Sequence, residues 1–107
     1  MKLAPKNWYL TSYVNNTWTS VISETEPVII ASMVMANTSG SAVTVRVRLG
    51  DLSGNLVTII PGKELLGGES FSIDLRSVNV LPGQSLEISA TAPGAEFLLS
   101  GVIDAGV

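Results

Sequence analysis

The alternation of side chains between Val43 and Leu49 constrains the fold of this chain more than any other feature. Apolar residues at the odd positions alternate there with Thr44, Arg46 and Arg48. Because successive residues of a strand point to opposite faces, the segment predicts a strand with one apolar and one charged face. A period of two recurs in residues 70–75, 85–90 and 95–103, and no segment shows the period of a helix. The pattern therefore indicates an all-β protein.

Two clusters of turn-forming residues predict hairpins. Residues 28–36 are nearly all apolar, as in a strand covered on both faces, and Asn37 to Ser41 then form a polar turn. We expect a hairpin that pairs residues 28–36 with residues 43–49. A second hairpin is predicted around Asn15-Asn16-Thr17, between residues 9–14 and 18–22.

Other turns come from glycine and proline. Pro61-Gly62 predicts the end of a strand over residues 56–60, since proline cannot donate to a strand ladder. Leu66-Gly67-Gly68-Glu69 resembles Leu81-Pro82-Gly83-Gln84, and each tetrapeptide precedes an alternating strand. The repeat predicts two similar corners of one sandwich.

About eight short strands of this kind indicate an antiparallel β-sandwich or jelly roll, with a closed barrel as the alternative. The length of 107 residues allows one domain, which we place at residues 9–107. Residues 1–8 show no alternation and contain Pro5. We expect an N-terminal arm there, outside the ladders.

Composition excludes several classes of function. The chain has no histidine and no cysteine, so the commonest general base and thiolate metal sites are absent. The net charge of −3 includes no basic run, which argues against nucleic acid as a partner. No secretory signal or membrane span is evident, and we expect a protein made in the cytoplasm that contacts no membrane. Charged residues make up only 14%, which favours a surface buried against other subunits.

The remaining polar residues do not form a catalytic pattern. Glu24 and Glu26 fall in a loop, and Asp74 and Glu87 take outward strand positions, where solvated carboxylates are the rule. Asp51-Leu52-Ser53-Gly54-Asn55 has the oxygen spacing that begins a calcium loop but lacks its closing glutamate, so a turn is the better interpretation. We expect no catalytic residues, no metal and no cofactor, and therefore no enzyme.

A few aromatic and basic residues are candidate contacts with partners. Aromatic side chains near the N-terminus could form a sugar-stacking platform, although packing in the core or between subunits is favoured. The two arginines of residues 43–49 could pair with acids of a neighbouring subunit or stay solvated, and both alternatives remain open. The candidate contacts with subunits or capsid are Leu3, Trp8, Tyr9, Trp18, Arg46 and Arg48.

The strand and turn signatures together resemble small β-sandwich virion proteins of tailed bacteriophages. The resemblance lies in residues 36–49, in Ile59-Ile60-Pro61-Gly62, in the two repeated corners and in Leu99-Ser100-Gly101-Val102, and it covers roughly residues 9–104. It implies a β-sandwich that decorates capsids or belongs to a tail or fibre, often as a trimer. It implies no catalytic residue.

The resemblance and the composition lead to one functional expectation and one alternative. We expect a virion structural protein, most plausibly a capsid decoration (cement) protein that forms a homotrimer. Its partners would be further copies of itself and the major capsid protein or another virion protein. The alternative is a tail- or fibre-associated module, or a β-sandwich module that binds a carbohydrate or receptor.

Overall fold

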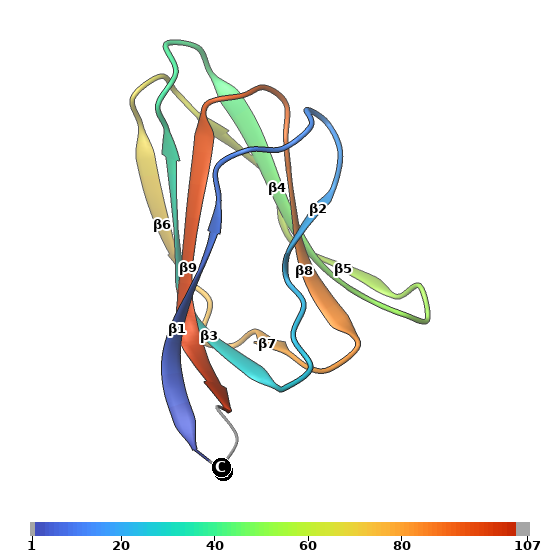
Figure 1. The fold of residues 1–107 in the computed structure, drawn as a ribbon. Helices are drawn as coiled ribbons and strands as arrows, with labels where there is room; N and C mark the ends of the chain where they lie inside the picture. The colour runs from blue at the N-terminus through green and yellow to red at the C-terminus, as the bar shows by residue number, and fades with distance from the viewer. Residues whose placement is uncertain (1, 105–107) are drawn as a thin grey trace.

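The computed structural model describes residues 2–104, and in that range the chain forms nine strands and no helix. Sheet A has the order β1 (Leu3–Leu10), β9 (Ala95–Asp104), β3 (Val28–Asn37) and β6 (Ser70–Asp74), and β7 (Asn79–Val80) also pairs with β3. Sheet B has the order β2 (Thr19–Ile22), β8 (Gln84–Ala90), β4 (Val43–Asp51) and β5 (Leu56–Leu65). The sheets are antiparallel and pack face to face (Figure 1). The predicted antiparallel sandwich is confirmed.

The core between the sheets consists of the alternating apolar residues. The alternation in residues 43–49, 70–75, 85–90 and 95–103 places nine apolar side chains inward. Seven of them are buried, while Phe71 and Ile73 on the edge strand β6 are partly buried against the same core. Burying each such side chain is worth about 1.5–3 kcal/mol relative to leaving it exposed. The seven buried residues are Val43, Val45, Val47, Leu86, Ile88, Phe97 and Leu99.

The predicted N-terminal arm is wrong, because residues 3–8 belong to strand β1. The strand pairs with β9 along its whole length, from Leu3 opposite Asp104 to Leu10 opposite Phe97. Pro5 is compatible with this arrangement because β1 is the edge strand of sheet A, where a proline nitrogen can face solvent. Met1 lies outside the described residues.

Both predicted hairpins are also wrong. The turn at residues 15–17 joins β1 of sheet A to β2 of sheet B, and residues 38–42 join β3 of sheet A to β4 of sheet B. The turn residues were recognised, but a turn of this kind can lead either to a neighbouring strand or to the facing sheet. Strand β3 therefore has one buried face and one outward face, on which Ile29 and Val34 are exposed.

Strand β5 does not end at Pro61. The strand continues to Leu65 through a bulge: Val45 lies opposite Lys63, but Val47 already lies opposite Ile60. Strand β5 is the edge of sheet B, which again allows a proline within the strand.

The two repeated corners have the same geometry. In each, the glycine at the third position has a positive φ, +79° at Gly68 and +87° at Gly83. The backbone N–H of the fourth residue donates to the carbonyl of the leucine, and the side chain of the fourth residue accepts the leucine N–H. The sequence repeat is thus one turn used twice, as predicted.

A buried asparagine joins two turns and the last residue of β5 at one end of the sandwich. Asn37 is 1% exposed, and its Nδ2 donates to the carbonyls of Ser41 at 2.7 Å and Leu65 at 2.9 Å. Its Oδ1 accepts the N–H and the hydroxyl of Ser39. Its main chain exchanges two further bonds with the Gly68 corner, through Gly68 N–H and the Glu69 carbonyl. The residue therefore satisfies backbone groups from several segments at once.

A bulge in β3 explains why β9 has a glycine at position 101. Ile30 lies opposite Gly101 and Ser32 opposite Ser100, so Ala31 is the extra residue. A Cβ at position 101 would lie 2.3 Å from the Ile29 carbonyl oxygen, closer than any side chain tolerates. Only glycine allows β9 to pass the bulge without a shift of the backbone.

We predict that Asn37→Asp destabilises the fold by about 2–4 kcal/mol, because it removes both donors to the carbonyls of Ser41 and Leu65 and buries a charge. The loss should be visible as a lower urea midpoint at pH 7. Asn79→Asp is the matched control, because Asn79 is exposed. Equal midpoints for the two variants would contradict the role assigned to Asn37.

We predict that Gly101→Ala lowers stability by about 1–3 kcal/mol, because the added methyl group forces the bulge backbone to move. Gly40→Ala is the control, since no atom lies within 4 Å of a Cβ at Gly40. Thermal unfolding followed by circular dichroism measures both. If Gly101→Ala melts at the same temperature as the wild type, the bulge accommodates the methyl group without cost and the prediction is wrong.

Candidate functional site

Trp8 was predicted as a contact residue, but its side chain is buried in the core of the sandwich and leaves little surface for a partner. Its side chain is 6% exposed and lies in the core. Its Nε1–H donates to Glu24 Oε1 at 3.1 Å, and the Lys6 ammonium lies 2.6 Å from the same oxygen. These bonds hold the pKa of Glu24 below its usual value, with the Lys6 bond as the larger cause. The cluster ties β1 to the loop before β3 and is a structural contact.

Arg48 is engaged within the chain. Its Nε donates to Glu87 Oε1 at 2.6 Å, and the two residues lie opposite each other on β4 and β8. The guanidinium carbon also lies 4.1 Å from the centroid of the Trp18 ring. Arg46 is exposed on the same outer face of sheet B. For Arg46, pairing with an acid of a neighbouring subunit and solvation both stay open. Arg48 and Trp18, in contrast, stabilise each other.

The aromatic side chains do not form a common platform for a sugar. Trp8 lies in the core and Trp18 lies under Arg48. Tyr13 packs edge-on against Phe97, donates its hydroxyl to the Ala92 carbonyl at 2.7 Å and accepts the Ala95 N–H at 3.1 Å. Tyr9 is exposed, on the outer face of sheet A. The favoured packing interpretation therefore holds for Trp8 and Tyr13.

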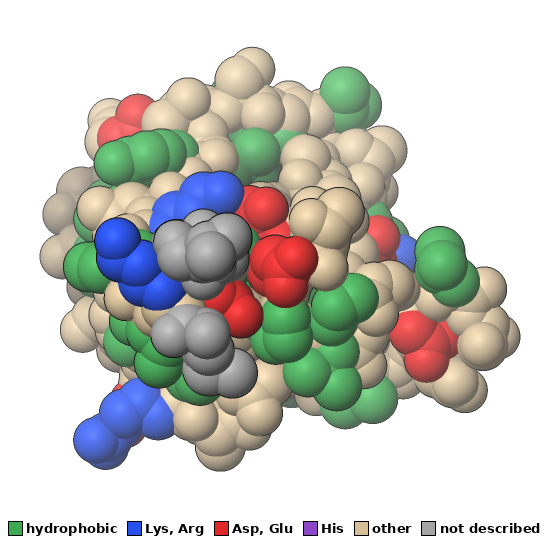
Figure 2. Space-filling view, turned by 60° about the horizontal axis from the view of Figure 1, so that its bottom comes forward, with side chains coloured by type: hydrophobic (Ala, Val, Ile, Leu, Met, Phe, Trp, Pro, Cys, Tyr) green, Lys and Arg blue, Asp and Glu red, His purple; other side chains and the backbone are tan. Residues whose placement is uncertain are grey.

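A wide groove lies at the end of the sandwich that holds the β4–β5 hairpin tip. It has a volume of about 600 Å³ and is bounded by residues 23–25, the end of β4, the hairpin tip and the β7–β8 turn. Figure 2 shows acidic and hydrophobic side chains next to one another at this end of the molecule. The lining of this groove mixes hydroxyl, carboxylate and leucine side chains.

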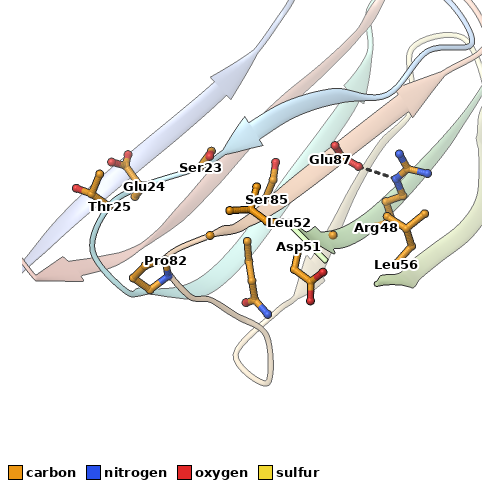
Figure 3. Close-up of a pocket in the computed structure, with 13 residues that line it drawn as sticks. Ser23, Glu24, Thr25, Arg48, Asp51, Leu52, Leu56, Pro82, Ser85 and Glu87 are labelled. Atoms are coloured by element: carbon orange, nitrogen blue, oxygen red, sulfur yellow. Dashed lines mark hydrogen bonds and ion pairs between the residues drawn. The ribbon is translucent and has the colours of Figure 1, made fainter. Parts of the chain in front are cut away.

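The carboxylates of this groove are all used locally. In Figure 3, Glu87 points at Arg48, whereas Asp51 points away from both. Asp51 accepts the Asn55 side-chain amide, which is the largest cause of its lowered pKa, and also the backbone N–H groups of Asn55 and Ser53. Residues 51–55 thus form a turn, as predicted, in place of a calcium loop. Within residues 2–104, no three metal-binding side chains gather in one place.

The outer face of sheet A offers a different kind of surface. The strand register aligns four exposed side chains in a row across β1, β9, β3 and β6. We call this row the tyrosine row: Tyr9, Leu98, Val34 and Ser72. Tyr9 is 68% exposed, Val34 41% and Leu98 37%. Exposed apolar side chains in contact with one another are a mark of protein–protein contact surfaces.

Two further rows flank the tyrosine row. On one side lie Asn7, Ser100, Ser32 and Asp74, and on the other Glu96, Ala36 and Ser70. The three rows together form what we call the tyrosine face. Beside Tyr9 the face has a shallow hollow of about 250 Å³, whose lining includes Thr11, Ala36, Glu96 and Leu98. None of the side chains in the three rows is basic.

The candidate contacts on β1 thus divide by the face they occupy. Leu3 and Tyr9 are exposed and point outward from sheet A, as a contact surface requires, whereas Trp8 points inward. Val34 and Leu98 were not predicted to be exposed. The signal was present in the apolar run 28–36, which was interpreted as a strand buried on both faces.

Comparison with known proteins identifies no relative. No protein-family model matches the chain, and no curated protein matches it either. In the described residues, no helix is long and apolar enough to cross a membrane.

We predict that acid weakens the fold partly through Glu24. Because the folded-state pKa of Glu24 is lowered, its stabilising contribution is present above its usual pKa of about 4.5 and is lost as the pH falls through the lower folded value. Glu24→Gln should therefore reduce the fall in urea midpoint between pH 5 and pH 3. Glu26→Gln, an exposed change in the same loop, is the control. The same acid dependence in wild type and Glu24→Gln would contradict this assignment.

Proposed function

We propose that this chain is a structural protein of a tailed-bacteriophage virion, and more narrowly a capsid decoration protein that associates with copies of itself and binds the shell. The observation that carries the proposal is the presence of two separate exposed apolar surfaces on a small rigid sandwich. One is the tyrosine face. The other is the tip of the β4–β5 hairpin, where Leu52 is 93%, Val57 60% and Leu56 56% exposed.

The two surfaces lie on different parts of the molecule. Figure 1 shows the β4–β5 hairpin extending beyond the sandwich on the side opposite β6, whereas the tyrosine face belongs to sheet A. A protein that decorates a shell needs contacts with the shell and with its neighbours, and many weak contacts then add up through avidity. We assign the hairpin tip to the major capsid protein or another virion protein, and the tyrosine face to self-association, for which the sequence resemblance implies a trimer.

The proposal includes no catalytic role. The carboxylates of the end groove are paired or bound in a turn, and the sequence has neither histidine nor cysteine. These observations support a binding protein over a hydrolase.

The second candidate is a tail- or fibre-associated module that binds a receptor glycan. The end groove favours it to a limited extent, because Ser23, Thr25 and Gln84 could form hydrogen bonds to sugar hydroxyls there. The absence of a stacking platform weighs against it, since Trp18 lies against Arg48. Detection of the protein in purified tails, or glycan binding abolished by Thr25→Ala, would favour this candidate.

We predict that Leu52→Asp lowers binding to undecorated shells at least tenfold, because it places a charge where an apolar side chain would be buried. The measurement is co-sedimentation of purified protein with purified shells. The fold should be unaffected, since Leu52 is almost fully exposed.

Leu66→Asp is the matched control. Leu66 is 55% exposed but belongs to the corner at residues 66–69, near the Asn37 end of the sandwich. Equal loss of binding in both variants, or no binding of the wild-type protein to shells, would contradict the proposed function.

A further inference from the structure

We propose that the tyrosine face binds the tyrosine face of a second copy of this chain across a two-fold axis. The inference rests on the self-association part of the proposed function, and it replaces the trimer that the sequence resemblance implies by a two-fold dimer. A two-fold contact uses the same patch on both subunits, so the patch must be complementary to itself. Two features of the tyrosine face meet this requirement, its relief and its charge, and its area determines how strong the contact can be.

The relief alternates between large and small side chains. Tyr9, Leu98 and Val34 form the large row, and the adjoining row has only Ala36 and Ser70 beside Glu96. A two-fold axis that runs parallel to these rows and between them places the large row of each copy over the small row of the other. Tyr9 of the second copy then enters the hollow of about 250 Å³ beside Thr11 and Ala36.

The charges on the face are compatible with this arrangement. Glu96 is the one side chain in the lining of the hollow that is charged at neutral pH, and the lining also includes Tyr9. In the two-fold arrangement, the phenol of the incoming Tyr9 can donate to the Glu96 carboxylate, and each Glu96 faces Leu98 of the other copy in place of a second carboxylate. Asp74 lies on the edge strand β6 and is paired with Arg76 at 2.7 Å. No like charges therefore meet at the centre.

The area is that of a weak, transient contact. Four strands about 4.8 Å apart, with three rows that span about six residues at ~3.3 Å each, give a face of roughly 400 Å². Two such faces bury about 800 Å², below the size of a stable specific interface. We therefore expect a reversible dimer that a high local concentration on a shell would favour.

The first test is analytical ultracentrifugation of the full chain over a range of concentrations. Wild type should show a reversible monomer–dimer equilibrium. Leu98→Glu should raise the dissociation constant by roughly 30-fold or more, as loss of a central apolar contact does. Ala36→Leu should also weaken the dimer, because it fills the hollow. Leu52→Asp should leave the dimer unchanged, and the thermal transition checks that each variant folds.

The second test uses the absence of cysteine in the chain. In the proposed arrangement, residue 98 of one copy lies over residue 96 of the other. A mixture of the single variants Leu98→Cys and Glu96→Cys should therefore form a mixed disulfide dimer under mild oxidation, in higher yield than a mixture of Leu52→Cys and Glu96→Cys.

The outcomes separate this inference from the proposed function. A monomeric wild type, or a trimer that survives Leu98→Glu, would overturn the two-fold contact even if the protein binds shells. A dimer that Leu98→Glu dissociates would support the contact even if no shell is bound, and in that case the decoration function alone would fail.

Discussion

The arrangement of the two sheets depends on the four hydrogen bonds of one buried amide. The side chain of Asn37 accepts from Ser39 and donates to the carbonyls of Ser41 and Leu65, at the point where the chain leaves sheet A for sheet B. A polar group without partners there would cost about 1–3 kcal/mol, a large share of the stability of a small domain. Because every donor and acceptor is matched, the chain can cross between the sheets in a short turn, and the β4–β5 hairpin then starts in a defined position.

Local pattern predicted the elements of this fold but not their partners. The alternation of residues 43–49 and 85–90 identifies strands and their inward side chains, because the period of two is a property of each strand by itself. Whether a turn leads to a neighbouring strand or to the facing sheet depends on contacts such as that of Asn37 with Leu65, which are 28 positions apart. The N-terminal arm predicted from Pro5 was wrong for a related reason. A proline is compatible with an edge strand, and only the complete strand order shows that β1 is an edge.

The candidate sites show the same division between local and distant information. The turn of Asp51 with Asn55 was recognised from sequence because its partners are four residues apart. Arg48 and Glu87 are 39 positions apart, and Tyr9 and Leu98 become neighbours only when β1 pairs with β9. Sequence could therefore name Tyr9 and Arg48 as residues of interest but could not say that one lies on an exposed apolar row and the other in an internal ion pair.

The prolines in the two long edge strands, β1 and β5, affect how the protein behaves at high concentration. Strands β1 and β5 each carry one proline, and β5 also has a bulge, while the opposite edges, β2 and β6, are only four and five residues long. An added strand would lose ladder bonds at Pro5 or Pro61, so growth of either sheet by edge-to-edge pairing is disfavoured. Molecules crowded at high concentration should therefore resist conversion into fibrils, and their sheet faces and loop ends remain the surfaces through which ordered contacts can form.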